Sequence, residues 1–408
     1  MSFLISHSNN EIKTSFNISG SKSESNRLLI LKHLFNDLEI KNLSDSDDTL
    51  VLQEGLSKDS GSVNVHHAGT AMRFLTAYFS TQENKYYEIL GSSRMHERPI
   101  KILVDALNSL GADIKYLGKK GYPPLKINGK KINKFEVSLN ANISSQYITA
   151  LILIGPSLDK GLSINLLGKI TSKPYIEMSI ALLQRIGVNA TFINNRIEIK
   201  AIKNKKTCIY NVESDWSSLS YFFSIVALSK KSNLEIGTYF SDSIQGDKKL
   251  IEIYNKLGVK TFFKNNIINL KKDENFNLPQ SLELRLNHTP DLAQTIAVTS
   301  FGLGLPCDLH GLHTLKIKET DRLSALKIEL EKLGAEVKIT PNSLHLKKSN
   351  QIKKNIKINT YSDHRMAMAF APLGIISPII INDPDVISKS FPSFWRLIRK
   401  LNFKVTEY

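Results

Sequence analysis

The sequence predicts an α/β protein built from two similar domains, and three observations support this. The chain has 408 residues, which is long for a single hydrophobic core. A pattern of an amphipathic helix, a glycine turn and a short strand recurs along it. Further strands, with alternating apolar and polar residues, separate the copies at residues 15–18, 162–166 and 356–360. Interleaved helices and strands are typical of the α/β class.

Four copies of the repeat are clear. Each turns at a glycine, where a helix C-cap needs a positive φ. The glycines recur at intervals of about 75 residues, which is too long for a solenoid repeat and suits a small α/β unit. The copies cover residues 103–114, 180–192, 250–262 and 326–339, with Gly111, Gly187, Gly258 and Gly334 at the turns.

Two weaker copies lie towards the ends of the chain. One covers residues 52–65 and runs through Gly61, and the other covers residues 395–405 and turns at Asn402. Six units fit two domains of three units each. The first unit is cramped, because Gly61 precedes Gly111 by only about 50 residues where the repeat needs about 75. We therefore expect the first unit to have lost secondary structure.

Composition argues against several classes of protein. Apolar residues make up 41% of the chain, and no run is long enough to span a bilayer. The first 16 residues lack the pattern of a secretory signal, and two cysteines make no disulfide framework, so we expect a cytoplasmic protein. The net charge of +16 is compatible with a nucleic-acid or membrane partner, but the lysines are scattered and form no basic tail. A site for small anions is favoured instead.

Three polar motifs in the first quarter of the chain point to anion binding. Residues 20–27, GSKSESNR, follow a strand and open an apolar helix at residues 28–35, so amide groups, Lys22 and Arg27 form a seat for an anion. Residues 67–73, HAGTAMR, contain Thr70 as an expected N-cap and Gly69, which permits close approach to the backbone. Residues 94–99, RMHERP, place two arginines four positions apart.

Two serine-rich motifs, at residues 144–146 and 172–175, stand just before expected helices. Hydroxyl and amide groups there suit a phosphate and sugar hydroxyls, although ordinary helix capping is the favoured explanation when these motifs are taken alone.

The candidates for acid–base chemistry come late in the chain. Asp291 stands at an expected helix start, and residues 318–322, KETDR, place Glu319 among basic side chains. Residues 363–365, DHR, and 389–392, KSFP, complete the set. A carboxylate beside lysine and arginine can have a tuned pKa and act as a proton donor or base. The histidine pairs lack recognised zinc spacing, so no metal is expected.

Taken together, these motifs resemble those of EPSP synthases, in order from Gly20 to Pro392. The resemblance implies two domains, each with three βαβαββ units in an inverted α/β barrel-like arrangement, the first unit here being shortened. It places residues 20–213 in an N-terminal domain on the shikimate 3-phosphate side. Residues 1–19 and 214–408 together form the second domain.

The resemblance also implies a reaction and site residues. The 5-hydroxyl of shikimate 3-phosphate would attack C2 of phosphoenolpyruvate while C3 is protonated, and phosphate would then leave, without cofactor or metal. The implied catalytic residues are Asp291, Glu319 and Lys22. Residues implied to bind shikimate 3-phosphate are Lys22, Ser23, Arg27, Ser144, Ser145, Gln146, Ser172, Tyr175, Asp291, Thr314 and Lys318. Residues implied to bind phosphoenolpyruvate are Lys22, Gly69, Arg73, Arg98, Gln146, Arg322, His364, Arg365 and Lys389. The expected form is a monomer with these two small-molecule substrates, no nucleic acid and no membrane.

Three features depart from the usual pattern of the family. His67 and Thr314 stand where asparagine is common, and the stretch between Asp48 and His66 is short. Three alternatives stay open at this point. The first is a UDP-N-acetylglucosamine enolpyruvyltransferase, although that family usually carries a loop cysteine that residues 94–99 lack. The second is a catalytically inactive binding protein of this fold. The third is an RNA-processing enzyme of similar repeat architecture.

Overall fold

The structure is a computed structural model that describes residues 1–8, 11–35, 37–142, 144–202, 207–349 and 351–408. The chain divides into two compact units, which we call the discontinuous unit (1–19 and 213–408) and the continuous unit (20–212). The expected boundary differs by one residue, because Glu213 belongs to the discontinuous unit. Its buried carboxylate accepts hydrogen bonds from Trp216 Nε1 and Phe240 N, both at 2.8 Å.

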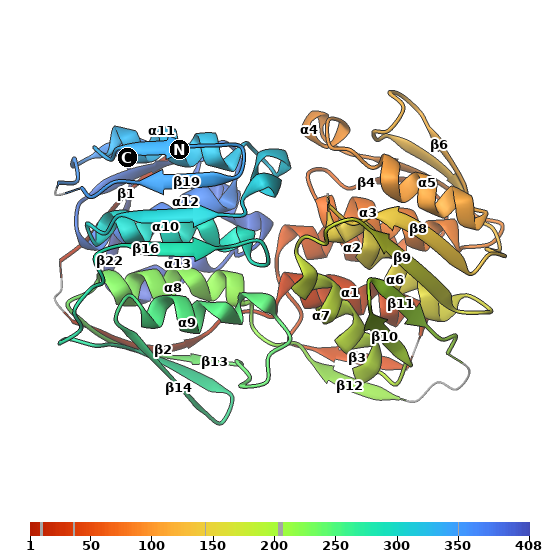
Figure 1. The fold of residues 1–408 in the computed structure, drawn as a ribbon, viewed down its shortest axis with the longest axis horizontal. Helices are drawn as coiled ribbons and strands as arrows, with labels where there is room; N and C mark the ends of the chain where they lie inside the picture. The colour runs from red at the N-terminus through yellow and green to blue at the C-terminus, as the bar shows by residue number, and fades with distance from the viewer. Residues whose placement is uncertain (9–10, 36, 143, 203–206, 350) are drawn as a thin grey trace. The chain divides into compact units, whose positions relative to one another are not determined.

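The described residues form five four-stranded sheets and one two-stranded sheet (Figure 1). Every four-stranded sheet has the same plan, with one parallel pair followed by two antiparallel strands. The discontinuous unit contains three of these sheets. The first consists of β2(Glu11–Asn17), β13(Lys231–Gly237), β15(Ile267–Lys272) and β14(Val259–Lys264), and the second of β16(Leu282–Arg285), β17(Cys307–His310), β19(Ser343–Leu346) and β18(Val337–Ile339). The third consists of β20(Ile356–Ile358), β21(Ile379–Asn382), β1(Ser2–His7) and β22(Phe403–Glu407).

The continuous unit contains two four-stranded sheets and the two-stranded one. The four-stranded sheets are β4(Gly61–Asn64), β5(Tyr86–Leu90), β7(Leu125–Asn128) and β6(Asp113–Tyr116), and β8(Glu136–Asn140), β9(Leu162–Leu167), β11(Arg196–Ile199) and β10(Ala190–Ile193). The remaining sheet pairs β3(Leu38–Lys41) with β12(Cys208–Asn211) in parallel. These sheets confirm the α/β class and the repeated unit.

The shortened first unit retains its parallel strand pair and lacks the antiparallel hairpin among the described residues. The interpretation of residues 52–65 as a weak repeat copy was wrong in one respect. The strand that follows helix α2(Asp47–Ser57) is β4, which opens the sheet of the next unit. The chain therefore passes from the second helix of one unit directly to the first strand of the next, which explains the close spacing of Gly61 and Gly111.

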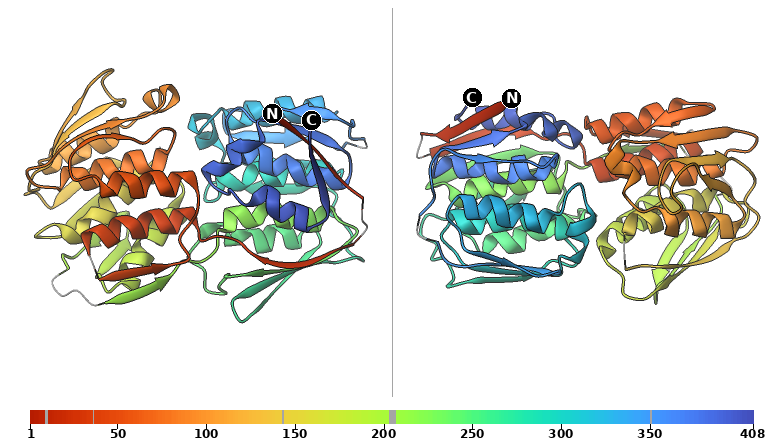
Figure 2. Two further views of the ribbon diagram at one scale, coloured as in Figure 1. Left: turned by 180° about the vertical axis from the view of Figure 1, so that it is seen from behind. Right: turned by 90° about the horizontal axis from the view of Figure 1, so that it is seen from above.

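Strands β2 and β12 each pair with a strand that is distant in sequence. Strand β2 precedes the continuous unit in sequence but pairs in parallel with β13, and β12 precedes the second half of the discontinuous unit but pairs with β3. Strand β1 pairs with both β21 and β22, so the two ends of the chain lie side by side (Figure 2).

Each unit has one nearly fully buried helix per sheet and a second, half-exposed one. In α8(Trp216–Leu228) every residue except Ser217 is buried, and α10(Ala293–Gly302) and α12(His364–Phe370) are similar. A helix that is apolar on all sides belongs in the interior. The half-exposed helices are α9(Leu250–Asn255), α11(Arg322–Lys332) and α13(Phe394–Lys400).

The continuous unit repeats this arrangement. Its buried helices are α1(Lys22–Leu34), α3(Gly69–Ser80) and α6(Ser145–Ile154), and its other helices are α2, α4(Ser93–His96), α5(Lys101–Leu110) and α7(Lys173–Arg185). Short 3-10 turns are η1(Gly155–Ser157), η2(Gly246–Lys249), η3(Pro290–Leu292), η4(His313–Ile317), η5(Ala371–Ile375) and η6(Pro384–Lys389). No described helix has the length and apolar character needed to cross a membrane.

The turn residues between second helix and hairpin confirm the sequence interpretation. Gly111, Gly187, Gly258 and Gly334 all have φ between 77° and 110°, and Asn402 has φ 65°. A positive φ suits glycine, because it carries no Cβ, and asparagine tolerates it.

Candidate active site

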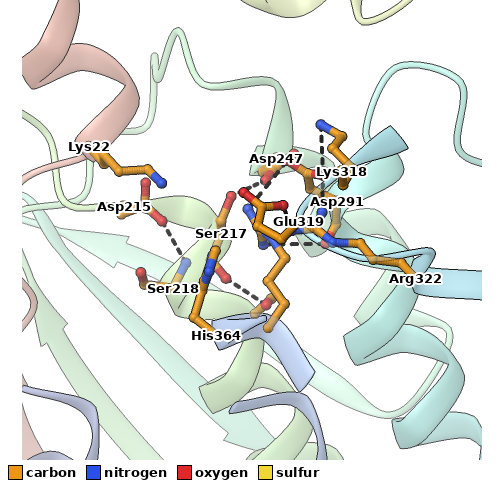
Figure 3. A network of polar contacts seen from close by, with 12 residues as sticks. Lys22, Asp215, Ser217, Ser218, Asp247, Asp291, Lys318, Glu319, Arg322 and His364 are labelled. Carbon is orange, nitrogen blue, oxygen red and sulfur yellow. Dashed lines mark hydrogen bonds and ion pairs between the residues drawn. The ribbon is translucent and has the colours of Figure 1, made fainter. Parts of the chain in front are cut away.

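The late polar motifs of the discontinuous unit come together around one arginine. Arg322, at the start of α11, is buried, and its Nε lies 2.6 Å from Asp363 Oδ2. Its Nη1 lies 2.8 Å from Asp291 Oδ1, and its Nη2 lies 2.8 Å from Glu319 Oε2 (Figure 3). One guanidinium therefore holds three carboxylates in fixed positions, which only the planar fork of arginine can do.

Three further cations surround the same carboxylates. Lys318 Nζ lies 3.4 Å from Asp291 Oδ1, and Arg365 Nη2 lies 3.4 Å from Asp291 Oδ2. Lys389 Nζ lies 3.0 Å from Glu319 Oε1 and is almost fully buried. Four cations thus enclose Asp291 and Glu319, and both carboxylates keep a small exposed edge, with about 15% of each side chain accessible.

Local sequence explains this convergence. Pro290 and Asp291 form η3, a turn that leads into α10, while Asp321 and Asp363 cap α11 and α12. Asp321 Oδ1 accepts from the amides of Leu323 and Ser324 at 3.2 Å, and Asp363 accepts from Arg365 N at 2.9 Å. The late polar motifs therefore lie at the starts of helices and turns, and the convergence of these starts brings the charged side chains together.

The remaining expected residues of this unit are buried nearby. His364 lies in the first turn of α12, with Nδ1 3.8 Å from Asp363 Oδ1. Thr314 lies in η4, four residues before Lys318, and its buried Oγ1 has no hydrogen-bond partner in the described part of the chain.

In the continuous unit, Arg27 connects three helices. Its guanidinium donates to Ser179 Oγ at 2.9 Å, to Ser23 O at 2.7 Å and to Tyr175 O at 3.3 Å. A longer bond of 3.4 Å reaches Thr149 Oγ1. The side chain is buried, and because burial disfavours the charge, the pKa of Arg27 is lowered to about 10.

Arg73 also donates to backbone groups. Its Nη1 lies 3.2 Å from Gly69 O and its Nη2 lies 3.0 Å from Pro99 O, so it ties the start of α3 to the segment after α4. Arg98 packs over Gly69, because a Cβ there would lie 2.6 Å from Arg98 Nη1. Gly69 thus permits close approach, as expected, and the approaching group is a side chain of the same unit.

Serine side chains mark the other helix starts. Ser144 caps α6 and accepts from Gln146 N at 3.3 Å, while Gln146 Nε2 lies 3.3 Å from Thr70 Oγ1. Ser145 is the first residue of α6, and Ser172, with φ 53°, precedes α7. Three sequence expectations need correction here. Helix α1 begins at Lys22 rather than residue 28, and Ala68 and not Thr70 is the N-cap of α3. The two serine-rich motifs do not stand wholly before their helices, because residues 145–146 lie inside α6 and residues 173–175 lie inside α7.

Comparison with known proteins decides the family. The model of the EPSP synthase family, described as 3-phosphoshikimate 1-carboxyvinyltransferase, matches residues 53–398. This chain belongs to the EPSP synthase family. It is 42% identical over 399 residues to the 3-phosphoshikimate 1-carboxyvinyltransferase of Bacteroides fragilis strain YCH46, with 97% of both chains covered. The enzyme of that name from Marinomonas sp. strain MWYL1 is 35% identical over 430 residues, with 97% of this chain and 98% of the relative covered.

The fold agrees with that family. The EPSP synthase structure from Acinetobacter baumannii superposes with a TM-score of 0.79 at 19% identity and covers 100% of both chains. This likeness confirms the two-domain α/β fold. No group of three or more possible metal ligands occurs among the described residues.

The structure of this EPSP synthase family member adds carboxylates that the motifs did not reveal. Asp48, in the first turn of α2, lies 3.0 Å from Lys22 Nζ and is buried. Asp215 caps α8 and accepts from Ser218 N at 2.7 Å. Asp247, in η2, is buried and accepts from Ser217 Oγ at 2.5 Å. Each lies in the first turn, or at the cap, of a helix or 3-10 turn, which was the only signal available in the sequence.

The pKa values of Asp291 and Asp247 are shifted in opposite directions. Burial favours the neutral form of Asp291, but Lys318, Arg365 and Arg322 outweigh it and hold its pKa well below the usual range. For Arg322, burial is outweighed by Asp363, Glu319 and Asp291, so its pKa is raised. Burial dominates at Asp247 and raises its pKa to about 6.

Proposed function

We propose that this chain transfers the enolpyruvyl group of phosphoenolpyruvate to the 5-hydroxyl of shikimate 3-phosphate, giving 5-enolpyruvylshikimate 3-phosphate and phosphate. The relatives are named after this transfer. We assign the transfer to aromatic amino-acid and chorismate biosynthesis. The observation that carries the proposal is the pair Asp291 and Glu319, held among four cations with an exposed edge on each carboxylate.

The charges of this cluster suit the reaction. Phosphoenolpyruvate carries a carboxylate and a phosphate, and preorganised cations stabilise such groups and the charge that develops on them. We assign phosphoenolpyruvate binding to Lys22, Gly69, Arg73, Arg98, Gln146, Arg322, His364, Arg365 and Lys389. For Gly69 and Arg73 the supporting contacts are indirect, because Gly69 makes room for Arg98, and Arg73 ties the start of α3 to the segment after α4.

Proton transfer is assigned to the two carboxylates. Asp291, with its lowered pKa, is ionised and can accept a hydrogen bond from the 5-hydroxyl. It takes the hydroxyl proton only as the oxygen bonds to C2, because that bond makes the proton strongly acidic. Glu319 gives the proton that C3 gains in the addition and recovers it in the elimination, when phosphate leaves. Lys22, 3.0 Å from buried Asp48, is the third catalytic candidate.

Shikimate 3-phosphate is assigned to the serine-rich helix starts of the continuous unit. Hydroxyl and amide donors at helix N-termini bind phosphate and sugar hydroxyls. The assigned residues are Lys22, Ser23, Arg27, Ser144, Ser145, Gln146, Ser172, Tyr175, Asp291, Thr314 and Lys318. For Arg27 the contacts support an indirect role, because four of its hydrogen bonds go to groups of its own unit.

The deciding experiment measures phosphate release from phosphoenolpyruvate by the purified protein in the presence of EDTA. We expect release with shikimate 3-phosphate and none with UDP-N-acetylglucosamine. Loss of release in Glu319→Gln would place the chemistry at the cluster. Absence of release with either acceptor would overturn the proposal. We further propose that the protein acts as a cytoplasmic monomer without cofactor, nucleic acid or membrane partner, which size-exclusion chromatography with light scattering tests for oligomeric state.

A further inference from the structure

Glu329 is a buried carboxylate of α11 that the proposed reaction leaves without a role. Its side chain is fully buried, and both of its oxygens accept hydrogen bonds from one neighbouring segment. Tyr361 Oη donates to Oε1 at 2.6 Å, and Asn359 N donates to Oε2 at 3.1 Å. Lys332, at the end of the same helix, forms an ion pair with Oε2. A buried carboxylate needs such partners, so the informative feature is the segment that Glu329 holds.

That segment is the turn between β20 and α12, and its backbone is strained. Tyr361 and Ser362 have φ values of 54° and 55°, in the left-handed region. Residues other than glycine and asparagine rarely adopt this conformation, because their Cβ approaches a backbone carbonyl. It persists only where surrounding contacts fix it. The hydrogen bonds that fix it here include the two to Glu329 and one from Asp363 N to Thr360 O at 2.9 Å.

The turn leads directly into residues of the candidate active site. Asp363 Oδ2 lies 2.6 Å from Arg322 Nε, and Asp363 Oδ1 accepts from Arg365 N at 2.9 Å. Arg365 Nη2 in turn lies 3.4 Å from Asp291 Oδ2. The start of α12 therefore brings these side chains to the cluster in the register that the turn sets.

Helix α11 is attached to this part of the chain at two points. Arg322 opens the helix and contacts Asp363. Glu329, seven residues later, accepts from Tyr361. Seven residues are close to two helical turns, so both side chains lie on one face of α11, about 10 Å apart along its axis. The strained turn lies between the two attachments. Loss of the second one would let the turn relax and displace Asp363 and Arg365.

We propose that Glu329 is a positioning residue for the enolpyruvyl transfer, because it holds the strained turn that presents Asp363 and Arg365 to the cluster. This inference rests on the proposed function, which assigns phosphoenolpyruvate to Arg365. Glu329 contacts neither substrate in this proposal and acts through Tyr361 and the backbone of Asn359. Its loss should therefore impair the use of phosphoenolpyruvate in a protein that still folds.

Three substitutions separate hydrogen bonding from charge. Glu329→Met keeps a similar length and removes both acceptors. Glu329→Gln removes the charge but keeps an oxygen for Asn359 N, and its amide can donate to Tyr361 Oη, because a phenol both donates and accepts. Tyr361→Phe removes only the hydroxyl. The glutamine variant should therefore stay close to the wild type in activity, whereas the other two should lose activity.

The kinetic test measures kcat and KM for each substrate. For phosphoenolpyruvate, kcat/KM should fall on the order of 100-fold in Glu329→Met, because a misplacement of about 1 Å in a site can have that effect. It should fall about tenfold in Tyr361→Phe, which loses one hydrogen bond. KM for shikimate 3-phosphate should change less, because Asp291 keeps its contacts with Arg322 and Lys318. A loss in Glu329→Gln equal to that in Glu329→Met would overturn the inference.

Two control variants separate positioning from general destabilisation. Glu331→Met makes the same change two residues away on α11, where the carboxylate is exposed and lies 3.7 Å from Lys327. Tyr254→Phe removes a buried tyrosine hydroxyl of the same unit, which lies 2.9 Å from Thr299 Oγ1. Both should keep wild-type kcat and KM, although Tyr254→Phe should lose stability as Tyr361→Phe does. Equal kinetic losses in the two tyrosine variants would contradict a positioning role.

A rescue experiment tests the strained turn itself. Asparagine tolerates the left-handed region better than serine does. Ser362→Asn should therefore recover several-fold of the kcat/KM that Glu329→Met loses, and should add less to the wild type, where Glu329 already holds the turn. Identical effects of Ser362→Asn in the two backgrounds would mean that Glu329 does not act through this turn.

Hydrogen exchange gives a readout that does not depend on turnover. The amides of Asp363, Arg365 and Met366 are hydrogen-bonded in the turn and at the start of α12. In Glu329→Met, residues 359–370 should exchange on the order of tenfold faster, with residues 293–302 of α10 unchanged. If this variant does not fold, Tyr361→Phe carries the same test. Unchanged exchange at residues 359–370 would overturn the inference. A wild type that forms no product would instead overturn the proposed function, and the exchange data would still test the turn.

Discussion

The two units start their helices in different ways. In the discontinuous unit, aspartates cap α8, α11 and α12, and each accepts backbone amides. In the continuous unit, serines cap α1, α4 and α6, and the starts of α3 and α7 have no side-chain cap bond. An aspartate offsets the partial positive charge of a helix start, whereas a serine leaves it for an incoming anion.

Two buried arginines, one in each unit, follow the same division. Arg322 contacts three carboxylates, whereas Arg27 donates hydrogen bonds to hydroxyl and carbonyl groups. The discontinuous unit therefore brings its own anions and is suited to moving protons. The continuous unit offers donors and is suited to holding a phosphorylated ligand. The predictions below test this division, from the largest expected effect to the smallest.

Glu319→Gln should have the largest effect on catalysis. It removes the proposed proton donor but keeps the shape and an acceptor for Arg322, so kcat should fall on the order of 10² to 10⁴ fold. Asp321→Asn is the matched control, because it removes an equal charge two residues away and keeps a good N-cap. A similar loss of kcat in both variants would show that charge on this segment, and not Glu319, is what matters.

Arg322→Met should destabilise the protein more than Arg27→Met does. The first leaves three carboxylates without their central cation and should lower the free energy of unfolding by about 3 to 5 kcal/mol. The second leaves only neutral acceptors and should cost about 1 to 3 kcal/mol. Urea unfolding measures both, and equal losses would contradict the proposed difference between the units.

The two titrating aspartates should give opposite pH dependences of stability. The folded pKa of Asp291 is lowered, so its contribution is present at neutral pH and is lost as pH falls below about 4. The folded pKa of Asp247 is raised to about 6, so its contribution is present below about pH 4 and is lost as pH rises to 6.

Asp247→Asn should therefore become more stable relative to the wild type between pH 4 and 7, by about 3 kcal/mol for a shift of about two units. Asp291→Asn should show its largest loss of stability at neutral pH. Chemical denaturation at a series of pH values measures both differences, and flat differences across this range would contradict the assigned pKa directions.

Ser144→Ala should have the smallest effect. Loss of the α6 cap should cost about 1 kcal/mol of stability. If the hydroxyl also binds shikimate 3-phosphate, KM for that substrate should rise about two- to tenfold with kcat nearly unchanged. Ser157→Ala, which removes a serine hydroxyl from η1 at the far end of α6, is the control for which KM should not change.

Much of this arrangement was predictable because it depends on local chemistry. Positive φ at Gly111 or Gly334 follows from helix termination, and the clustering of Asp291, Glu319 and Arg322 follows from polar residues at helix starts. The contacts of Arg27 and Arg73 were not predictable, because the partners of a buried arginine are set by tertiary packing. Asp247 was missed for the same reason, since its partner Ser217 lies 30 residues away.

The pairing of β1 with β22 also constrains how the protein is made. Strand β1 pairs with β22, which is synthesised long after it, with Phe3 opposite Glu407, and β2 pairs with β13. The continuous unit has all its strands once residue 212 is synthesised, whereas the discontinuous unit is incomplete until β22 is synthesised. A gene fragment for residues 213–408 would leave the edges of β13 and β21 unpaired, and such edges promote aggregation.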